Sequence, residues 1–149
     1  MDKTRAGQVL AQYNNLFKEN DQLYHAAAKA FGLSDCAFWI LYSLCESDKP
    51  LTQSDICNLI YLPKQTVNSA LKKLEKDGLI ALEEMSDRRS KQLRLTQKGA
   101  KTAAQTAERV LAAERSAFLG LSMDEQDEFL LLFRKYTDLL KKSMAALTL

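Results

Sequence analysis

The sequence predicts a mainly α-helical fold with one small β-hairpin. Helical apolar spacing runs through most of the 149 residues, and only two prolines and five glycines interrupt it. One block, residues 63–99, combines an amphipathic helix with two short stretches of alternating polarity around a charged turn. A helix followed at once by a basic hairpin is the arrangement of a winged helix-turn-helix, which places a helix in a DNA major groove and the hairpin beside it.

The first two expected helices lie before this block. One covers residues 6–31, where apolar side chains recur every three or four positions, and it ends at Gly32. The next follows Ser34, a residue type that caps helix N-termini, and runs to about Ser47. Because this second helix is apolar nearly all round, we expect it at the centre of the fold.

A short third helix and an amphipathic fourth helix are expected to form the helix-turn-helix. Thr52 can cap the third helix, whose inner face is expected to carry Ile56, Leu59 and Ile60. Pro63 suits the first position of the fourth helix, where its missing N–H has no intrahelical partner to lose.

The fourth helix has an apolar stripe on one side and amide, hydroxyl and ammonium groups on the other. Gly78 suits the left-handed residue just past its end. Glutamine and asparagine can pair bidentately with adenine, and lysine can reach guanine or phosphate. A solvated helix face is the alternative interpretation, and the hairpin that follows favours DNA contact.

Two half-buried strands are expected at residues 80–82 and 93–95, where apolar and polar residues alternate. The turn between them carries Arg88 and Arg89, whose guanidinium groups can enter a minor groove or contact phosphates. Asp87 is close enough in sequence to pair with Arg89. An ordinary charged turn is the alternative interpretation of this tip.

Two further helices bring the expected total to about six. Thr96 can cap an alanine-rich helix over residues 97–119, and Ser122 with Glu125 forms a capping box for the last helix. The first helix and these last two carry three apolar stripes, more than the compact winged block needs to cover itself. We therefore expect these helices to meet a partner, with a monomeric helix bundle as the alternative.

Charge is unevenly distributed along the chain. Residues 63–101 contain ten lysines and arginines against five acidic residues, a net charge of +5, while the remainder has 11 against 14, a net charge of −3. A positive segment on a mildly acidic body is expected where a protein contacts phosphates. No stretch resembles a signal peptide or a membrane span, so a cytoplasmic location is expected.

Catalytic and metal chemistry find little support in the sequence. His25 is the single histidine, and no glycine-rich phosphate loop is present. Cys36, Cys45 and Cys57 lack CxxC spacing, so we expect buried core thiols rather than a zinc site, and we expect no cofactor. Redox sensing is the alternative, with Cys36 the best candidate because the first turn of a helix lowers a thiol pKa.

The block at residues 51–99 resembles the MarR family of bacterial winged helix-turn-helix transcriptional regulators. The resemblance rests on Leu-Thr-Gln-Ser-Asp-Ile at 51–56, Lys-Gln-Thr-Val at 64–67, Leu-Glu-Lys-Asp-Gly-Leu-Ile at 74–80, and an Asp-x-Arg turn followed by Leu-Thr-x-Lys-Gly over 87–99. The last pattern is specific. The sequence departs from the family at Tyr61, where a small residue is common, and at Pro63, where a Ser or Asn cap is common.

The resemblance implies one domain over residues 1–149, with a winged helix-turn-helix DNA-binding region at 35–99 and helical dimerisation regions at 1–32 and 100–149. It implies no enzyme but a repressor that binds a pseudo-palindromic operator as a homodimer and is relieved by a small ligand or by oxidation. A winged-helix protein-interaction module without DNA binding is the alternative function. The residues expected to contact DNA are Thr52, Gln53, Lys64, Gln65, Thr66, Asn68, Ser69, Lys72, Lys73, Arg88, Arg89 and Lys91.

An effector pocket, in the family pattern, would lie between the first two helices and the DNA-binding region. The residues this brings into consideration are Tyr13, Tyr24, His25, Trp39 and Tyr42. Each is better explained as a core or interface residue, so the sequence assigns none of them to a site.

Overall fold

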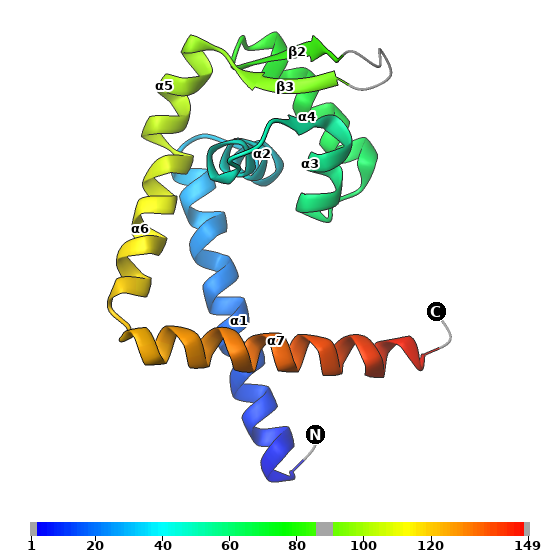
Figure 1. The fold of residues 1–149 in the computed structure, drawn as a ribbon, viewed down its shortest axis with the longest axis vertical. Coiled ribbons are helices and arrows are strands. Elements are labelled where there is room, and N and C mark those ends of the chain that lie inside the picture. Colours follow the sequence, from blue (N-terminus) through cyan, green and yellow to red (C-terminus); the bar gives the residue numbers. More distant parts are fainter. Residues whose placement is uncertain (1–2, 86–90, 148–149) are drawn as a thin grey trace. The chain divides into compact units, whose positions relative to one another are not determined.

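The computed structural model describes residues 3–85 and 91–147, and within them the predicted fold class is confirmed (Figure 1). The described elements are α1 (Arg5–Ala30), α2 (Asp35–Glu46), β1 (Leu51–Thr52), α3 (Gln53–Ile60), α4 (Lys64–Lys76), β2 (Ile80–Glu84), β3 (Lys91–Leu95), α5 (Gln97–Gln105), α6 (Ala107–Leu119) and α7 (Met123–Ala145). The chain divides into two compact units, Met1–Leu111 and Ala112–Leu149, which are described in turn.

The helices begin at the residues whose side chains can cap them. The hydroxyls of Ser34 and Thr96 accept hydrogen bonds from the backbone N–H groups of Ala37 and Gly99, as N-caps do. Thr52 forms a capping box at the start of α3, and Ser122 forms another at the start of α7. The four predicted caps are therefore confirmed.

The sheet of the first unit has three antiparallel strands in the order β1-β3-β2. Leu93 at the centre of β3 faces Leu51 on one side and Leu82 on the other, so one apolar layer crosses all three strands. The predicted hairpin corresponds to β2 and β3, which run side by side in Figure 1. The two-residue strand β1 was missed, because it is too short to show an alternating pattern.

The main core lies where α2, α3 and α4 pack against this sheet. Ile40, Ile56 and Val67 are fully buried there, and Leu93 from β3 is 3% exposed. Helix α2 packs against α1, α3, α4 and α5, so its predicted central position is confirmed. The prediction for α3 was partly wrong: Leu59 is 54% exposed, because the short helix turns only Ile56 fully toward the core.

A second cluster joins α1, α2 and the start of α6. Ala28, Phe38, Leu41 and Ala107 form its buried centre, with Trp39 and other aromatic residues packed around it. Small alanines at two of these positions allow the helix backbones to approach closely. This cluster fixes the C-terminal part of α1 against α2.

The wing is joined to α5 by a close backbone approach. A Cβ atom at Gly99 would lie 1.8 Å from the carbonyl oxygen of Leu79, so only glycine fits at this position. The same carbonyl accepts a hydrogen bond from the backbone N–H of Thr96. Lys98 adds a hydrogen bond from its ammonium group to the carbonyl of Asp77 at 2.8 Å.

The long helix expected over residues 97–119 is divided into α5 and α6 at Thr106. The backbone of Thr106 has φ −128° and ψ −91°, outside the helical region. Its hydroxyl donates to the carbonyl of Thr102 at 2.7 Å, which is the local bonding by which threonine competes with helix geometry. Thr106 is buried, so the break belongs to the packed interior.

The second unit consists of the end of α6 and the whole of α7. Phe129 makes an edge contact with Phe118 at 5.7 Å and stacks on Phe133 at 6.1 Å between ring centroids. Helix α7 nevertheless has no buried residue, and Leu130 and Leu131 are 67% and 69% exposed. Across the described residues, no helix is both long and apolar enough to pass through a bilayer.

Candidate nucleic-acid interface and ligand cavity

Helix α4 has one buried face and one polar face, as the sequence predicts. Val67, Leu71 and Leu74 are at most 3% exposed. Gln65, Thr66, Ser69, Lys72 and Lys73 are exposed, and Asn68 is half-buried at the edge between the two faces. Since successive turns of a helix bring residues three and four apart onto one side, Gln65, Ser69 and Lys72 share the outermost stripe.

An open cavity of about 950 Å³ lies between α3, α4 and the wing. Six of the expected DNA-contacting residues line it: Thr52, Gln53, Lys64, Asn68, Lys72 and Lys91. They come from four different elements, which the fold brings to one place. Gln65, Thr66, Ser69 and Lys73 lie outside this lining, and Asp87, Arg88 and Arg89 fall outside the described residues.

Two of these residues form a polar link between α3 and α4. The amide nitrogen of Gln53 donates to the amide oxygen of Asn68 at 2.6 Å in a partly buried position. This bond uses one acceptor position of Asn68 and leaves its amide N–H groups for other partners. The structure therefore distinguishes Asn68, which is held in place, from the exposed Gln65.

Lysines supply the free positive charge of this surface. Lys64, Lys72, Lys73 and Lys91 form no ion pair with any described residue. Arg94 differs, because its guanidinium pairs with the carboxylate of Glu83 on the neighbouring strand. The charge available for an anionic partner is thus concentrated around α4 and the start of β3.

Sequence reasoning missed two polar residues of this surface. Ser54 and Asn58 line the same cavity from α3. They stand four residues apart, so they lie along one side of the helix. That spacing was the available signal.

The turn before α4 contains Tyr61, the position where the sequence departs from the small residue common in the family. Tyr61 closes α3 with φ +58° and ψ +30°, and it is the one non-glycine residue with positive φ among those described. The left-handed region favours glycine because a Cβ atom crowds the backbone there. The tyrosine side chain is 91% exposed, so no described packing offsets this cost.

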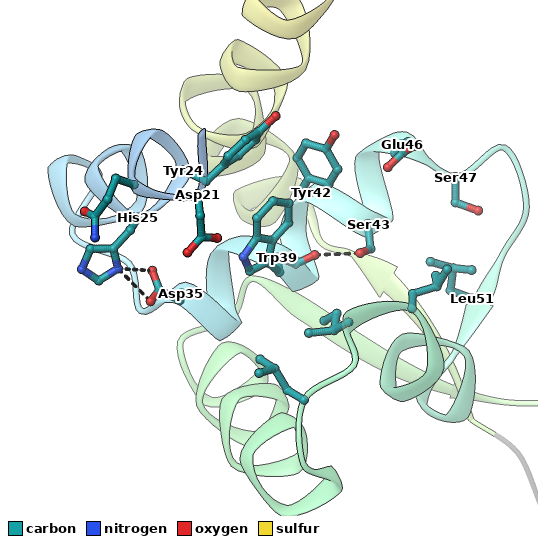
Figure 2. Close-up of a pocket in the computed structure, with 14 residues that line it drawn as sticks. Asp21, Tyr24, His25, Asp35, Trp39, Tyr42, Ser43, Glu46, Ser47 and Leu51 are labelled. Atoms are coloured by element: carbon teal, nitrogen blue, oxygen red, sulfur yellow. Dashed lines mark hydrogen bonds and ion pairs between the residues drawn. The ribbon is translucent and has the colours of Figure 1, made fainter. Parts of the chain in front are cut away.

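A second cavity, of about 820 Å³, lies between α1, α2 and the end of α3 (Figure 2). Its lining residues are Asp21, Gln22, Tyr24, His25, Asp35, Trp39, Tyr42, Ser43, Glu46, Ser47, Leu51, Leu59, Ile60 and Leu62. Four of the five aromatic and histidine residues considered from the sequence are among them, whereas Tyr13 is not.

One wall of this cavity is aromatic. The ring centroid of Trp39 lies 5.2 Å from that of Tyr24 and 5.0 Å from that of Tyr42. At one end, Nδ1 of His25 lies 2.9 Å from both carboxylate oxygens of Asp35 and so links α1 to α2. Figure 2 shows this pair with Asp21, Trp39 and the other labelled residues of the lining.

Comparison with known proteins identifies the family. Residues 31–90 match the model of the MarR family. The match assigns this part of the chain to the MarR family. The chain is 27% identical over 119 residues to the HTH-type transcriptional regulator YwoH of Bacillus subtilis, across 80% of this chain and 82% of the relative. The protein is therefore a MarR-family transcriptional regulator with a winged-helix DNA-binding fold.

Two solved structures share the fold of this chain. A MarR family regulator from Neisseria meningitidis has a TM-score of 0.76 and 25% identity, across 91% of this chain and 96% of that one. The structure of the S. aureus MepR–DNA complex has a TM-score of 0.66 and 22% identity, across 93% and 99%. The second likeness shows the fold alone.

Two of the thiols have raised pKa values, which suits the expected buried core thiols and not the redox-sensing alternative. Burial raises the pKa of Cys36, and the neighbouring Cys57 raises it further, so the expected lowering by the helix dipole is wrong. Burial, with a contribution from Glu108, raises the pKa of Cys45 to about 11. Both thiols stay protonated near neutral pH, where the thiolate is the reactive form. The described residues contain no cluster of three metal-ligating side chains.

Proposed function

We propose that this protein is a homodimeric repressor that reads a pseudo-palindromic operator with α4 and is released by a small ligand. The observation that carries the proposal is the polar face of α4. It presents Gln65, Ser69 and Lys72 outward, while the opposite face is locked into the core by Val67 and Leu71. A rigid helix with amides and ammonium groups on its open side suits a major groove.

The proposed contacts divide into base-reading and phosphate-binding groups. Gln65 is the exposed amide of α4 and is proposed to select bases. Asn68, whose amide oxygen accepts a hydrogen bond from Gln53, is proposed to contact a base as well. The remaining contacts are proposed to position the duplex through its backbone: Thr52, Thr66, Ser69, Lys64, Lys72, Lys73 and Lys91, with Arg88 and Arg89 at the wing. The MepR complex with DNA supports this use of the fold.

Exposed apolar helices support the proposed homodimer. On α1, Leu16, Phe17 and Leu23 are between 57% and 66% exposed. The large apolar side chains of α7 are exposed as well. Monomers rarely expose contiguous apolar surface on this scale. We propose that residues 1–32 and 100–149 cover one another across a two-fold axis, and that residues 35–99 form the reading head.

The cavity between α1, α2 and α3 supports release by a ligand. Leu59, Ile60 and Leu62 line it from the end of α3 and the turn before α4. A ligand that binds there contacts the helix-turn-helix directly and can shift it relative to α2. Release by a ligand is favoured over release by oxidation, because Cys36 and Cys45 have raised pKa values.

Selection of duplexes from a random pool tests DNA reading. We expect an enriched pseudo-palindrome, and Gln65→Ala should change base preference at matching positions of both half-sites. Lys72→Ala should weaken binding to all duplexes and reduce the salt slope by about one unit. Lys135→Ala on α7 is the matched control and should leave both properties unchanged.

The same experiment can contradict the proposal. A purified protein that enriches no duplex at low salt would favour the protein-interaction module. A consensus that changes with Lys72→Ala but not with Gln65→Ala would mean that another face of α4 meets the DNA.

A further inference from the structure

We infer that the cavity between α1, α2 and the end of α3 takes an organic cation with aromatic or other apolar groups, such as a quaternary or protonated amine. The inference rests on the proposed release by a ligand and specifies the chemical class of that ligand. Three properties of the lining carry it: the sign of its charge, the arrangement of its aromatic rings, and the position of its apolar residues.

The charge of the lining is negative. Asp21, Asp35 and Glu46 contribute carboxylates, and the described residues of the lining include no lysine or arginine. Its one basic side chain, His25, already pairs with Asp35. An anionic ligand entering this cavity would meet carboxylates without a cation to pair with, whereas a cation would be attracted.

Two of the carboxylates are available to a ligand. Within the described part of the chain, neither Asp21 nor Glu46 takes part in a hydrogen bond or an ion pair. Both side chains are exposed, so neither is committed to holding the fold together. Asp35 has a different role, because its bond to His25 connects α1 to the start of α2.

The aromatic wall suits a cation as well as an apolar group. Trp39 is half-buried and has Tyr24 and Tyr42 within 5.2 Å between ring centroids. A cation over the face of an aromatic ring, tryptophan above all, is attracted by the ring quadrupole. Asp21 lines the same cavity, so the site offers a cationic group both a carboxylate and an aromatic face.

The volume of the cavity and its apolar residues define the rest of the ligand. The volume of about 820 Å³ falls in the range of roughly 300–1,000 Å³ that drug-sized molecules occupy. Leu59, Ile60 and Leu62 provide apolar surface at the end of α3. A monocation with bulky apolar groups therefore contacts α1 and α2 through its charge and the helix-turn-helix through its hydrocarbon surface.

A pair of ions that differ in charge sign but share shape provides the test. Tetraphenylphosphonium is a monocation, and tetraphenylborate is its isosteric monoanion. Trp39 is the single tryptophan of the chain, so its fluorescence reports on the cavity wall directly. Titration of the full-length protein in sodium buffer, confirmed by calorimetry, should show the phosphonium binding at least about tenfold more tightly than the borate.

Charge-removing variants locate the site. Asp21→Asn and Glu46→Gln should each weaken phosphonium binding about threefold to tenfold, because each removes one carboxylate near the cation. Glu19→Gln on α1 and Asp48→Asn after α2 are matched controls, since neither residue lines the cavity, and both should bind like wild type. Equal affinity for the two ions, preference for the borate, or equal effects of the control and cavity variants would each overturn the inference.

A DNA-binding experiment separates this inference from the proposed function. Addition of phosphonium to the protein–operator complex should release the DNA, and Asp21→Asn should raise the concentration required by the same factor as its binding constant. Selective cation binding in a protein that binds no duplex would support the cavity assignment and contradict the proposed function. Operator binding in a protein that does not prefer the cation would contradict the cavity assignment alone.

Discussion

Helix α4 buries Val67, Leu71 and Leu74, each at most 3% exposed, whereas helix α7 buries none of its residues. Both helices carry apolar side chains at intervals of three and four positions. The difference lies in what the rest of the chain provides: α4 meets α2, α3 and β2. An apolar stripe therefore predicts a helix and a contact face, but not whether the contact lies within the same chain.

The two helices should stabilise different states of the protein. Burial on α4 stabilises the folded chain itself, since its apolar surface leaves water when one molecule folds. Apolar surface on α7 contributes to stability only when another surface covers it. If that surface belongs to a second chain, the contribution depends on protein concentration. Four experiments can break or sharpen this comparison.

The largest contrast is expected between matched leucines. Leu71→Ala in α4 should lower the free energy of unfolding by about 4 kcal/mol, because it removes a buried side chain and leaves a cavity. Leu131→Ala in α7, where the side chain is 69% exposed, should change it by less than about 0.5 kcal/mol. Urea denaturation at two protein concentrations measures both. Similar losses would show that α7 is covered within the chain.

A second contrast compares two glycines. Gly99→Ala should destabilise the winged region by about 3 kcal/mol, because its Cβ would overlap the Leu79 carbonyl oxygen. Gly120→Ala in the second unit should cost less than about 1 kcal/mol, since the nearest atom to its Cβ is the Ala117 carbonyl oxygen at 3.1 Å. Thermal unfolding of both variants measures the difference. A Gly99→Ala protein as stable as wild type would mean that the wing and α5 tolerate separation.

The third prediction concerns the open stripe of α7. The double substitution Phe133→Glu and Leu140→Glu should weaken dimerisation about thirtyfold, or about 2 kcal/mol, because two charges enter the apolar contact. Sedimentation equilibrium measures the dissociation constant. Lys135→Glu with Lys142→Glu adds acidic residues to the same helix outside the stripe and serves as the control. Unchanged dimerisation in the first variant, or a wild-type monomer, would contradict the proposed interface.

The smallest expected effect is a gain in stability at the turn before α4. Tyr61→Gly should raise the free energy of unfolding by up to about 1 kcal/mol, because glycine adopts positive φ without the Cβ penalty. The exposed tyrosine ring has little packing to lose. Chemical denaturation measures the gain, with Leu62→Gly as the neighbouring control, which should destabilise. A loss of stability in Tyr61→Gly would show that the ring makes a contact of its own.

Local chemistry in the sequence determined where the helices begin and which face of α4 is polar. Ser34, Thr52, Thr96 and Ser122 cap helices through bonds that span three residues, so each is readable from a short stretch of sequence. The polar face of α4 follows from the period of a single helix. These predictions held because they depend on atoms close together in the chain.

Contacts between distant residues decided what the sequence could not. Strand β1 exists because Leu51 pairs with Leu93, and the break at Thr106 occurs where that residue is buried in the interior. The pKa of Cys36 rises because burial removes solvent from the thiol, and this outweighs the local helix dipole. The ligand cavity likewise needs Asp21, Trp39 and Leu59 from three helices. Burial and cavities depend on which elements pack against each other, and only the tertiary structure specifies that packing.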